Sequence, residues 1–207
     1  MKRVCFISAI LMFTASAFSQ NVSAMNEKKA YFGISIGACA ASLVTKEELP
    51  SNLSVNYGGG WNMGVFTEVN MSKYFALSPR FEVSFIDGNI KNRRDDNRIV
   101  INRFLPLTMD FMVHAKLKRG KSKLNPYIAV GPKYQKVLSD GGREYEKWSD
   151  KSNLAIDFIM GMDLFFKRFV FAPELRYTYG LTDLNTLFTD VGEIKMNTLS
   201  LVFVFKG

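Results

Sequence analysis

The residues of this chain that could do chemistry are charged side chains set singly among apolar ones. Asp157 and Asp163 are the clearest pair of carboxylates, because they share one segment of alternating polarity. General acid–base catalysis needs both groups beside one reacting atom, whereas extended chain holds positions 157 and 163 about 20 Å apart. The single histidine, His114, falls on the same polar face, and no phosphate loop, metal cluster or nucleophile elbow accompanies it. We therefore expect no enzyme, no metal and no cofactor.

Two segments carry charge-swapped copies of one pattern. Residues 75–82 read Phe-x-x-x-Pro-Arg-x-Glu, and residues 169–176 read Phe-x-x-x-Pro-Glu-x-Arg. Charges withdrawn from water need partners. One interpretation is a buried network in which the two arginines neutralise facing carboxylates; the other is that each charge pairs with the adjacent strand or with water. The predicted network contains Arg80, Glu82, Asp110, Lys133, Asp157, Asp163, Glu174 and Arg176.

The elements that carry these charges show apolar residues at every second position. Phe81, Val83 and Phe85 alternate with Arg80, Glu82 and Ser84, for example. This period of two is typical of a β-strand, whose side chains point alternately to opposite faces. Eight such segments are predicted, at residues 31–42, 61–70, 75–86, 104–117, 126–137, 154–165, 169–180 and 196–205. The fold class is therefore all-β: an eight-stranded antiparallel up-and-down transmembrane β-barrel.

The connections alternate in length, which favours an outer-membrane location. Those at 71–74, 118–125 and 166–168 are short, and those at 43–60, 87–103, 138–153 and 181–195 are long and polar. Outer-membrane barrels have short periplasmic turns and long external loops, an apolar face toward lipid and a polar lumen. Because eight strands enclose only enough space for side chains, a diffusion channel is not expected. The alternative is a soluble exported barrel or sandwich, with the apolar face inside.

The first residues are typical of a secretory signal peptide. Lys2 and Arg3 precede an apolar run that is too short to span a membrane as a helix. We predict a signal peptide at 1–19, with cleavage after Ala17 or Ala24 as alternatives, and a barrel domain at 20–207. The net charge of +8 includes two leader residues, and no basic–aromatic pattern points to nucleic acid.

Two features of the strands and turns need separate explanations. Prolines at positions 79, 106, 132 and 173 fall inside predicted strands, where each removes a hydrogen bond, and either β-bulges or strand portions beyond the bilayer would accommodate them. Basic residues crowd one short turn, which is either a docking point for an acidic periplasmic partner or a solvated turn. These residues are Lys116, Lys118, Arg119, Lys121 and Lys123.

Three stretches resemble the outer-membrane β-barrel family that includes PorT: Asn-Pro-Tyr-Ile-Ala-Val-Gly at 125–131, Asp-x-x-x-Gly-x-Asp at 157–163 and Phe-Ala-Pro-Glu-Leu-Arg-Tyr-Thr-Tyr-Gly-Leu at 171–181. The resemblance implies an accessory of type IX protein secretion or assembly, without catalysis, that contacts outer-membrane lipid and secretion-system proteins on the periplasmic side. It supplies no active-site residues. The alternative is a structural or adhesive outer-membrane barrel that acts through its external loops.

Overall fold

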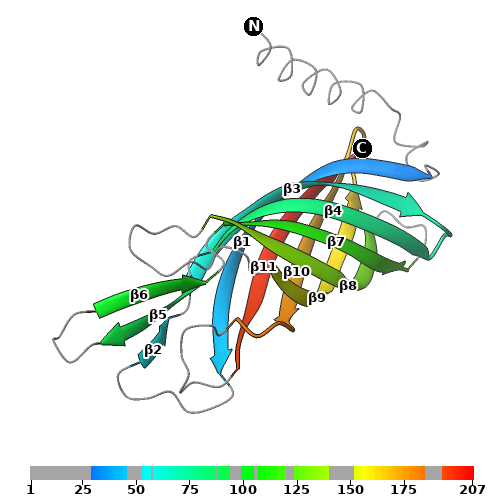
Figure 1. Cartoon of the computed structure of the whole chain (residues 1–207). Helices are drawn as coiled ribbons and strands as arrows, with labels where there is room; N and C mark the ends of the chain where they lie inside the picture. Colours follow the sequence, from blue (N-terminus) through cyan, green and yellow to red (C-terminus); the bar gives the residue numbers. More distant parts are fainter. Residues whose placement is uncertain are drawn as a thin grey trace, which may run out of the picture.

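Eight long antiparallel strands close into a barrel in the computed structural model (Figure 1). They are β1 (Ala30–Thr45), β3 (Gly58–Asn70), β4 (Phe75–Ile86), β7 (Leu107–Lys118), β8 (Leu124–Ser139), β9 (Ser152–Phe165), β10 (Val170–Gly180) and β11 (Ile194–Lys206). Each pairs with its neighbour along the barrel, and β1 pairs with β11 to close it. The predicted eight-stranded all-β barrel is confirmed.

The structure describes residues 29–45, 53–56, 58–86, 88–93, 99–104, 107–119, 124–139, 152–184 and 193–207. The predicted signal peptide and Pro106, Lys121 and Lys123 lie outside these residues. No helix within the described ranges has the length and apolarity needed to cross a membrane.

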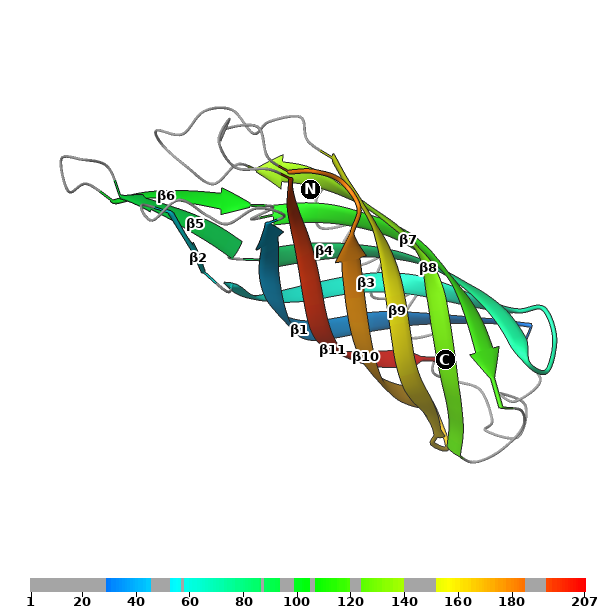
Figure 2. The ribbon, with the colours of Figure 1, turned by 90° about the horizontal axis from the view of Figure 1, so that it is seen from below.

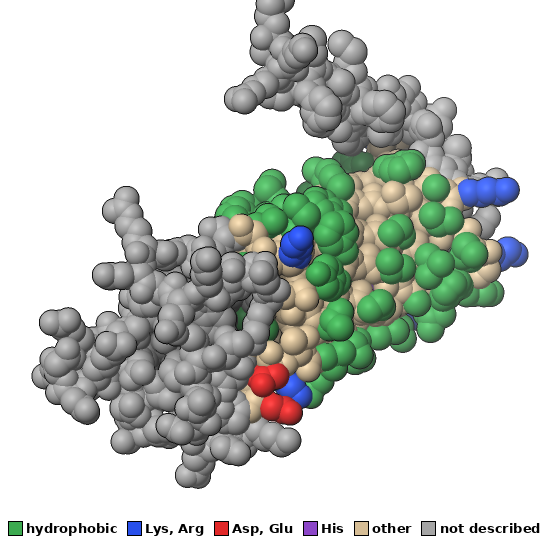
Figure 3. Space-filling model, viewed as in Figure 1, with side chains coloured by type: hydrophobic (Ala, Val, Ile, Leu, Met, Phe, Trp, Pro, Cys, Tyr) green, Lys and Arg blue, Asp and Glu red, His purple; other side chains and the backbone are tan. Residues whose placement is uncertain are grey.

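The strands place apolar side chains outside and polar ones inside. In β11, Leu199 and Leu201 are about half exposed, whereas Thr198 and Ser200 between and beside them are buried. The same alternation in the other strands produces an apolar belt around the barrel (Figure 3). In an outer-membrane barrel this belt faces lipid, and the buried face lines the lumen.

Three further strands form a small sheet beyond the long-loop end of the barrel. They are β2 (Leu53–Asn56), β5 (Gly88–Arg93) and β6 (Ile99–Phe104), in the order β2-β5-β6. β5 begins two residues after β4 ends, so the β4–β7 hairpin continues outward as β5–β6 (Figures 1 and 2). The segments at 43–60 and 87–103, predicted only as long polar connections, therefore contain strands that were not predicted. Polar and charged residues in these segments conceal their strand pairing.

The prolines interrupt pairing without shifting it. At Pro79, pairing of β4 with β3 skips two positions and resumes in the same register. The β7–β8 and β9–β10 ladders skip two positions at Pro132 and Pro173 in the same way. Of the two explanations offered for the prolines, bulges are not found at these three positions: a proline lacks the N–H of the ladder, and the strands accommodate that loss as a gap. Within the described strands, a register shift occurs instead between Leu107 and Thr108.

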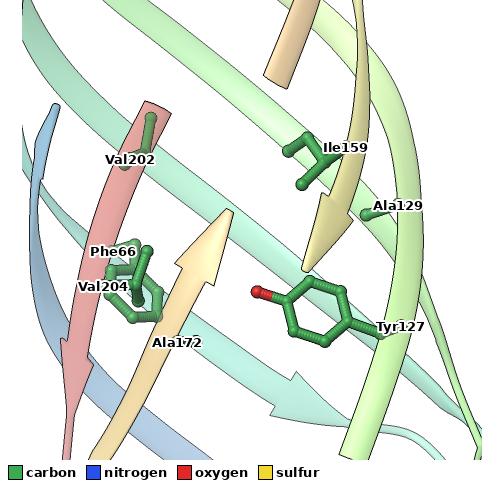
Figure 4. Packing of buried hydrophobic residues seen from close by; sticks show 7 residues of the cluster. All are labelled: Phe66, Tyr127, Ala129, Ile159, Ala172, Val202 and Val204. Atoms are coloured by element: carbon green, nitrogen blue, oxygen red, sulfur yellow. The ribbon is translucent and has the colours of Figure 1, made fainter. Parts of the chain in front are cut away.

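A small apolar cluster lies inside the lumen toward the short-turn end. Figure 4 shows Tyr127 of β8 pointing into the barrel, with Phe66 of β3 and Val204 of β11 on another part of the wall. The cluster comprises Phe66, Tyr127, Ala129, Ile159, Ala172, Val202 and Val204. Other buried apolar residues, such as Leu43, Met112 and Met196, lie among the polar and charged side chains of the inward face.

Candidate functional site

The lumen holds a balanced set of charges. Six carboxylates and six cations with buried or nearly buried side chains face it in the described strands. The carboxylates are Glu68, Glu82, Asp110, Asp157, Asp163 and Glu174, and the cations are Arg80, Lys116, Lys118, Lys133, Arg176 and Lys206. The structure places all eight residues of the predicted network among them. Because charges buried this deeply are costly unless paired, their partners define what the lumen can do.

At the centre, two arginines reach across the lumen from one wall to the other. Arg80 of β4 donates from Nη1 and Nη2 to the two carboxylate oxygens of Glu174 of β10, both at 2.6 Å. Arg176 of β10 donates to Glu82 of β4 at 2.7 and 3.0 Å. Both pairs are bidentate, which is the strong geometry of a guanidinium with a carboxylate. These contacts bridge strands on opposite sides of the barrel and so occupy its cross-section.

Neighbouring polar groups join the two arginine pairs into one unit. Arg176 Nη2 lies 3.7 Å from Glu174, so each arginine contacts this carboxylate. The Tyr127 hydroxyl donates to Glu174 at 2.7 Å, and the Ser35 hydroxyl donates to Glu82 at 3.0 Å. Each extra donor gives a second hydrogen bond to a carboxylate oxygen that already accepts one from an arginine.

Toward the long loops, Asp110 gathers donors from three strands. Lys133 Nζ lies 2.9 Å from Asp110, and Ser84 and Thr108 each donate to it at 2.7 Å. Gln135 adds weaker contacts at 3.2 and 3.3 Å. Asp110 is thus a structural acceptor.

His114 and Asp157 form a buried pair that lacks the geometry of a catalytic site. His114 Nε2 lies 2.9 Å from Asp157, while the Thr178 hydroxyl donates to the same carboxylate at 2.6 Å. In a nucleophilic triad the hydroxyl would bond to the histidine, but here both groups bond to the carboxylate. His114 is fully buried, and its Nδ1 has no partner among the described residues.

At the short-turn end, lysines surround two carboxylates. Glu68 contacts Lys116 at 3.0 Å and Lys206 at 2.7 Å, and it also pairs with Lys118. Asp163 contacts Lys116 at 3.2 Å and Lys206 at 3.0 Å. The Lys116 ammonium also lies 3.3 Å from the centroid of the Tyr127 ring, a cation–π geometry.

This cluster changes the interpretation of the basic turn. Lys116 is buried in the lumen and Lys118 turns inward to Glu68, so neither is available to a docking partner; Arg119 remains exposed. The sequence analysis also missed Lys206 as a lumen residue. Its position alternates with the outward-facing Phe205, and this parity was the signal that could have placed it inside.

Each proline gap faces an ionisable lumen residue on the neighbouring strand. The positions skipped on β3, β7 and β9 include Glu68, His114 and Asp163 respectively. Opposite them stand the small residues Ser78, Gly131 and Ala172, each next to its proline. At two of the gaps, Glu68 and Asp163 form ion pairs with lysines of other strands. Within the described ranges, no group of acidic, histidine and cysteine residues could hold a metal ion.

A family of outer-membrane proteins matches this chain in sequence, and solved outer-membrane proteins share its fold. A family model described as an outer membrane protein beta-barrel domain matches residues 18–185. The structure of OprG from Pseudomonas aeruginosa has a TM-score of 0.54 at 10% identity, covering 87% of this chain and 97% of that one. Neisserial surface protein A has a TM-score of 0.50 at 11% identity, covering 87% and 100%. No curated protein matches the sequence.

Proposed function

The chain belongs to the outer membrane protein beta-barrel domain family and resides in the outer membrane, and from this premise we propose that it is a non-catalytic, non-conducting barrel that presents a contact surface outside the cell. The barrel sits in the lipid bilayer, with its short turns toward the periplasm. The observation that carries the proposal is the β2-β5-β6 sheet, which extends the barrel beyond its long-loop end (Figure 2). The bridged lumen supports the non-conducting part, because Arg80 and Glu174 meet across it.

The pairing within this sheet is antiparallel and regular. β2 pairs with β5 from Leu53↔Asn92 to Asn56↔Asn89, and β5 pairs with β6 from Gly88↔Phe104 to Arg93↔Ile99. A paired sheet beyond the barrel gives an ordered surface, and such a surface outside the membrane favours contact with a protein.

A hairpin replacement tests this proposal. Replacing residues 88–104 with a short Asn-Gly turn should leave the barrel folded, since the eight barrel strands do not include them. We expect the variant to insert normally but to lose the cell–cell aggregation or surface attachment that the complete barrel restores in a deletion strain. Full attachment by the hairpin variant would contradict the proposal.

A role as a type IX secretion accessory is the second candidate. It is supported by the resemblance of residues 125–131, 157–163 and 171–181 to the PorT-containing family and by the exposed Arg119 at the periplasmic end. The secreted proteome of a deletion strain separates the two candidates. Periplasmic accumulation of proteins with C-terminal sorting domains would favour the accessory, whereas normal secretion with altered attachment would favour the external contact surface.

A further inference from the structure

The periplasmic end of the barrel carries an exposed basic rim. Its residues precede the first barrel strand or lie in the short connections, and all are exposed: Lys29, Lys73, Arg119, Lys167 and Arg168. Figure 3 shows Lys and Arg side chains at this end, beyond the apolar belt. The rim is thus a feature of several connections.

No exposed carboxylate accompanies the rim in the described residues. Glu68 and Asp163 lie at the same end but are buried in the lumen against lysines. The exposed acids Asp183 and Glu193 lie at the opposite end, next to β10 and β11. In the described part of the chain, no ion pair involves any of the five rim residues. These five cations are therefore available to bind anionic groups outside the barrel.

Apolar side chains alternate with these cations in the same connections. Tyr74 follows Lys73 and is 60% exposed, and Phe166 precedes Lys167 and is 48% exposed. Phe166 stacks on Phe169 with ring centroids 5.1 Å apart. Aromatic residues gather where the hydrocarbon core meets the headgroups, while long basic side chains reach outward to the polar layer. The rim cations are therefore expected at the depth of the lipid phosphates.

We propose that the basic rim binds the phosphate groups of anionic phospholipids in the periplasmic leaflet. The rim residues come from the start of β1 and from the β3–β4, β7–β8 and β9–β10 connections, so they are distributed around the circumference. A single docked protein would contact one arc, whereas lipids surround the barrel. Each Lys or Arg near an anionic surface strengthens binding by about fivefold. This site lies at the end opposite the proposed contact surface and does not depend on it.

The test compares lipid retention by the full-length folded barrel and its variants. The probe is a nanodisc or mixed micelle that contains equal amounts of phosphatidylglycerol and phosphatidylethanolamine. Bound lipids are counted by native mass spectrometry. The main variant is Lys167→Gln with Arg168→Gln; the matched control removes two exposed or partly exposed cations from the other end, with Lys136→Gln and Lys195→Gln. Resistance of the barrel to SDS at room temperature confirms that each variant is folded.

We expect the unaltered barrel to retain phosphatidylglycerol at least fivefold over phosphatidylethanolamine. The rim variant should lose most of this preference, added salt should weaken it, and the control pair should keep it. Equal retention of the two lipids by the unaltered barrel would overturn the proposal. An unchanged preference in the rim variant would also overturn the proposal. In that case, a cross-linker placed at position 119 in cells would test whether the rim binds an acidic periplasmic protein instead.

Discussion

Arg80 and Glu174 stand 94 positions apart in the sequence and meet inside the barrel through two hydrogen bonds of 2.6 Å. Arg176 and Glu82 have the same separation in the sequence with the charges exchanged. The two charge-swapped segments lie on β4 and β10, which are opposite each other in the eight-strand order. Their similarity in sequence therefore corresponds to contact in space.

Exchanging the charges of this pair should restore most of what each single change removes. Arg80→Glu places two carboxylates face to face, and Glu174→Arg places two guanidinium groups together. Breaking a buried pair costs about 3–5 kcal/mol. The double variant should recover more than half of the loss, with the remainder set by Arg176, which lies 3.7 Å from position 174. Urea unfolding of the barrel in lipid vesicles measures this recovery. If the singles fail to fold, folding of the double variant is the decisive result, and failure of all three would count against direct pairing.

Glu68→Gln should destabilise the barrel more than Asp163→Asn. Both changes remove one buried negative charge without changing shape. Glu68 pairs with three lysines, whereas Asp163 contacts two of them. We expect a loss of about 3–5 kcal/mol for Glu68→Gln and a smaller loss for Asp163→Asn. Equal unfolding free energies for the two variants would mean that the lysines do not depend on Glu68.

Gly161→Ala should displace Tyr127 from the lumen network. A Cβ at position 161 would lie 2.5 Å from Cζ and 2.6 Å from the hydroxyl of Tyr127, which donates to Glu174. We expect a cost of about 1–3 kcal/mol from overpacking, and a smaller cost in a Tyr127→Leu background. A double-mutant cycle isolates this coupling. Gly59→Ala is the control, because a Cβ there meets no atom within 4 Å; additive effects at 127 and 161 would exclude the contact.

Trp61 should report the lipid interface at the external end. Its ring stacks on Phe85 with centroids 4.3 Å apart and is 44% exposed on the outside of the barrel. Trp148 is the other of the two tryptophans in the sequence, and Trp148→Phe leaves Trp61 as the sole tryptophan. In this background, lipids brominated near the glycerol should quench Trp61 fluorescence more than lipids brominated near the chain ends. Quenching by neither lipid would place this side of the barrel outside the bilayer.

The alternation of apolar residues predicted the eight barrel strands well, because one face of each strand meets lipid and the other meets a polar lumen. The observed strands extend the predicted ones by a few residues at several ends, as at Thr45 of β1. The same rule misses β5 and β6, which lie beyond the belt and combine basic, amide and apolar residues without a regular contrast.

Charged residues near the strand ends were assigned to a turn because they are close to it in the sequence, and this assignment was wrong for Lys116. Lys116 lies close to a run of basic residues in the sequence and was grouped with the turn, although its parity with His114 places it in the lumen. The convergence of Lys116 and Lys206 on Glu68 depends on which strands are close across the barrel, and local sequence does not encode that distance.

Hydrogen bonds between adjacent strands run around the circumference of the barrel and hold neighbouring strands together. At Pro79, Pro132 and Pro173 the backbone ladder lacks two paired positions. Glu68 and Asp163 lie at two of these gaps, and both form ion pairs with Lys206 of β11. At this level the ion pairs across the lumen connect strands whose backbone ladder has a gap, so losing them would let neighbouring strands separate locally as well as lower the stability of the barrel.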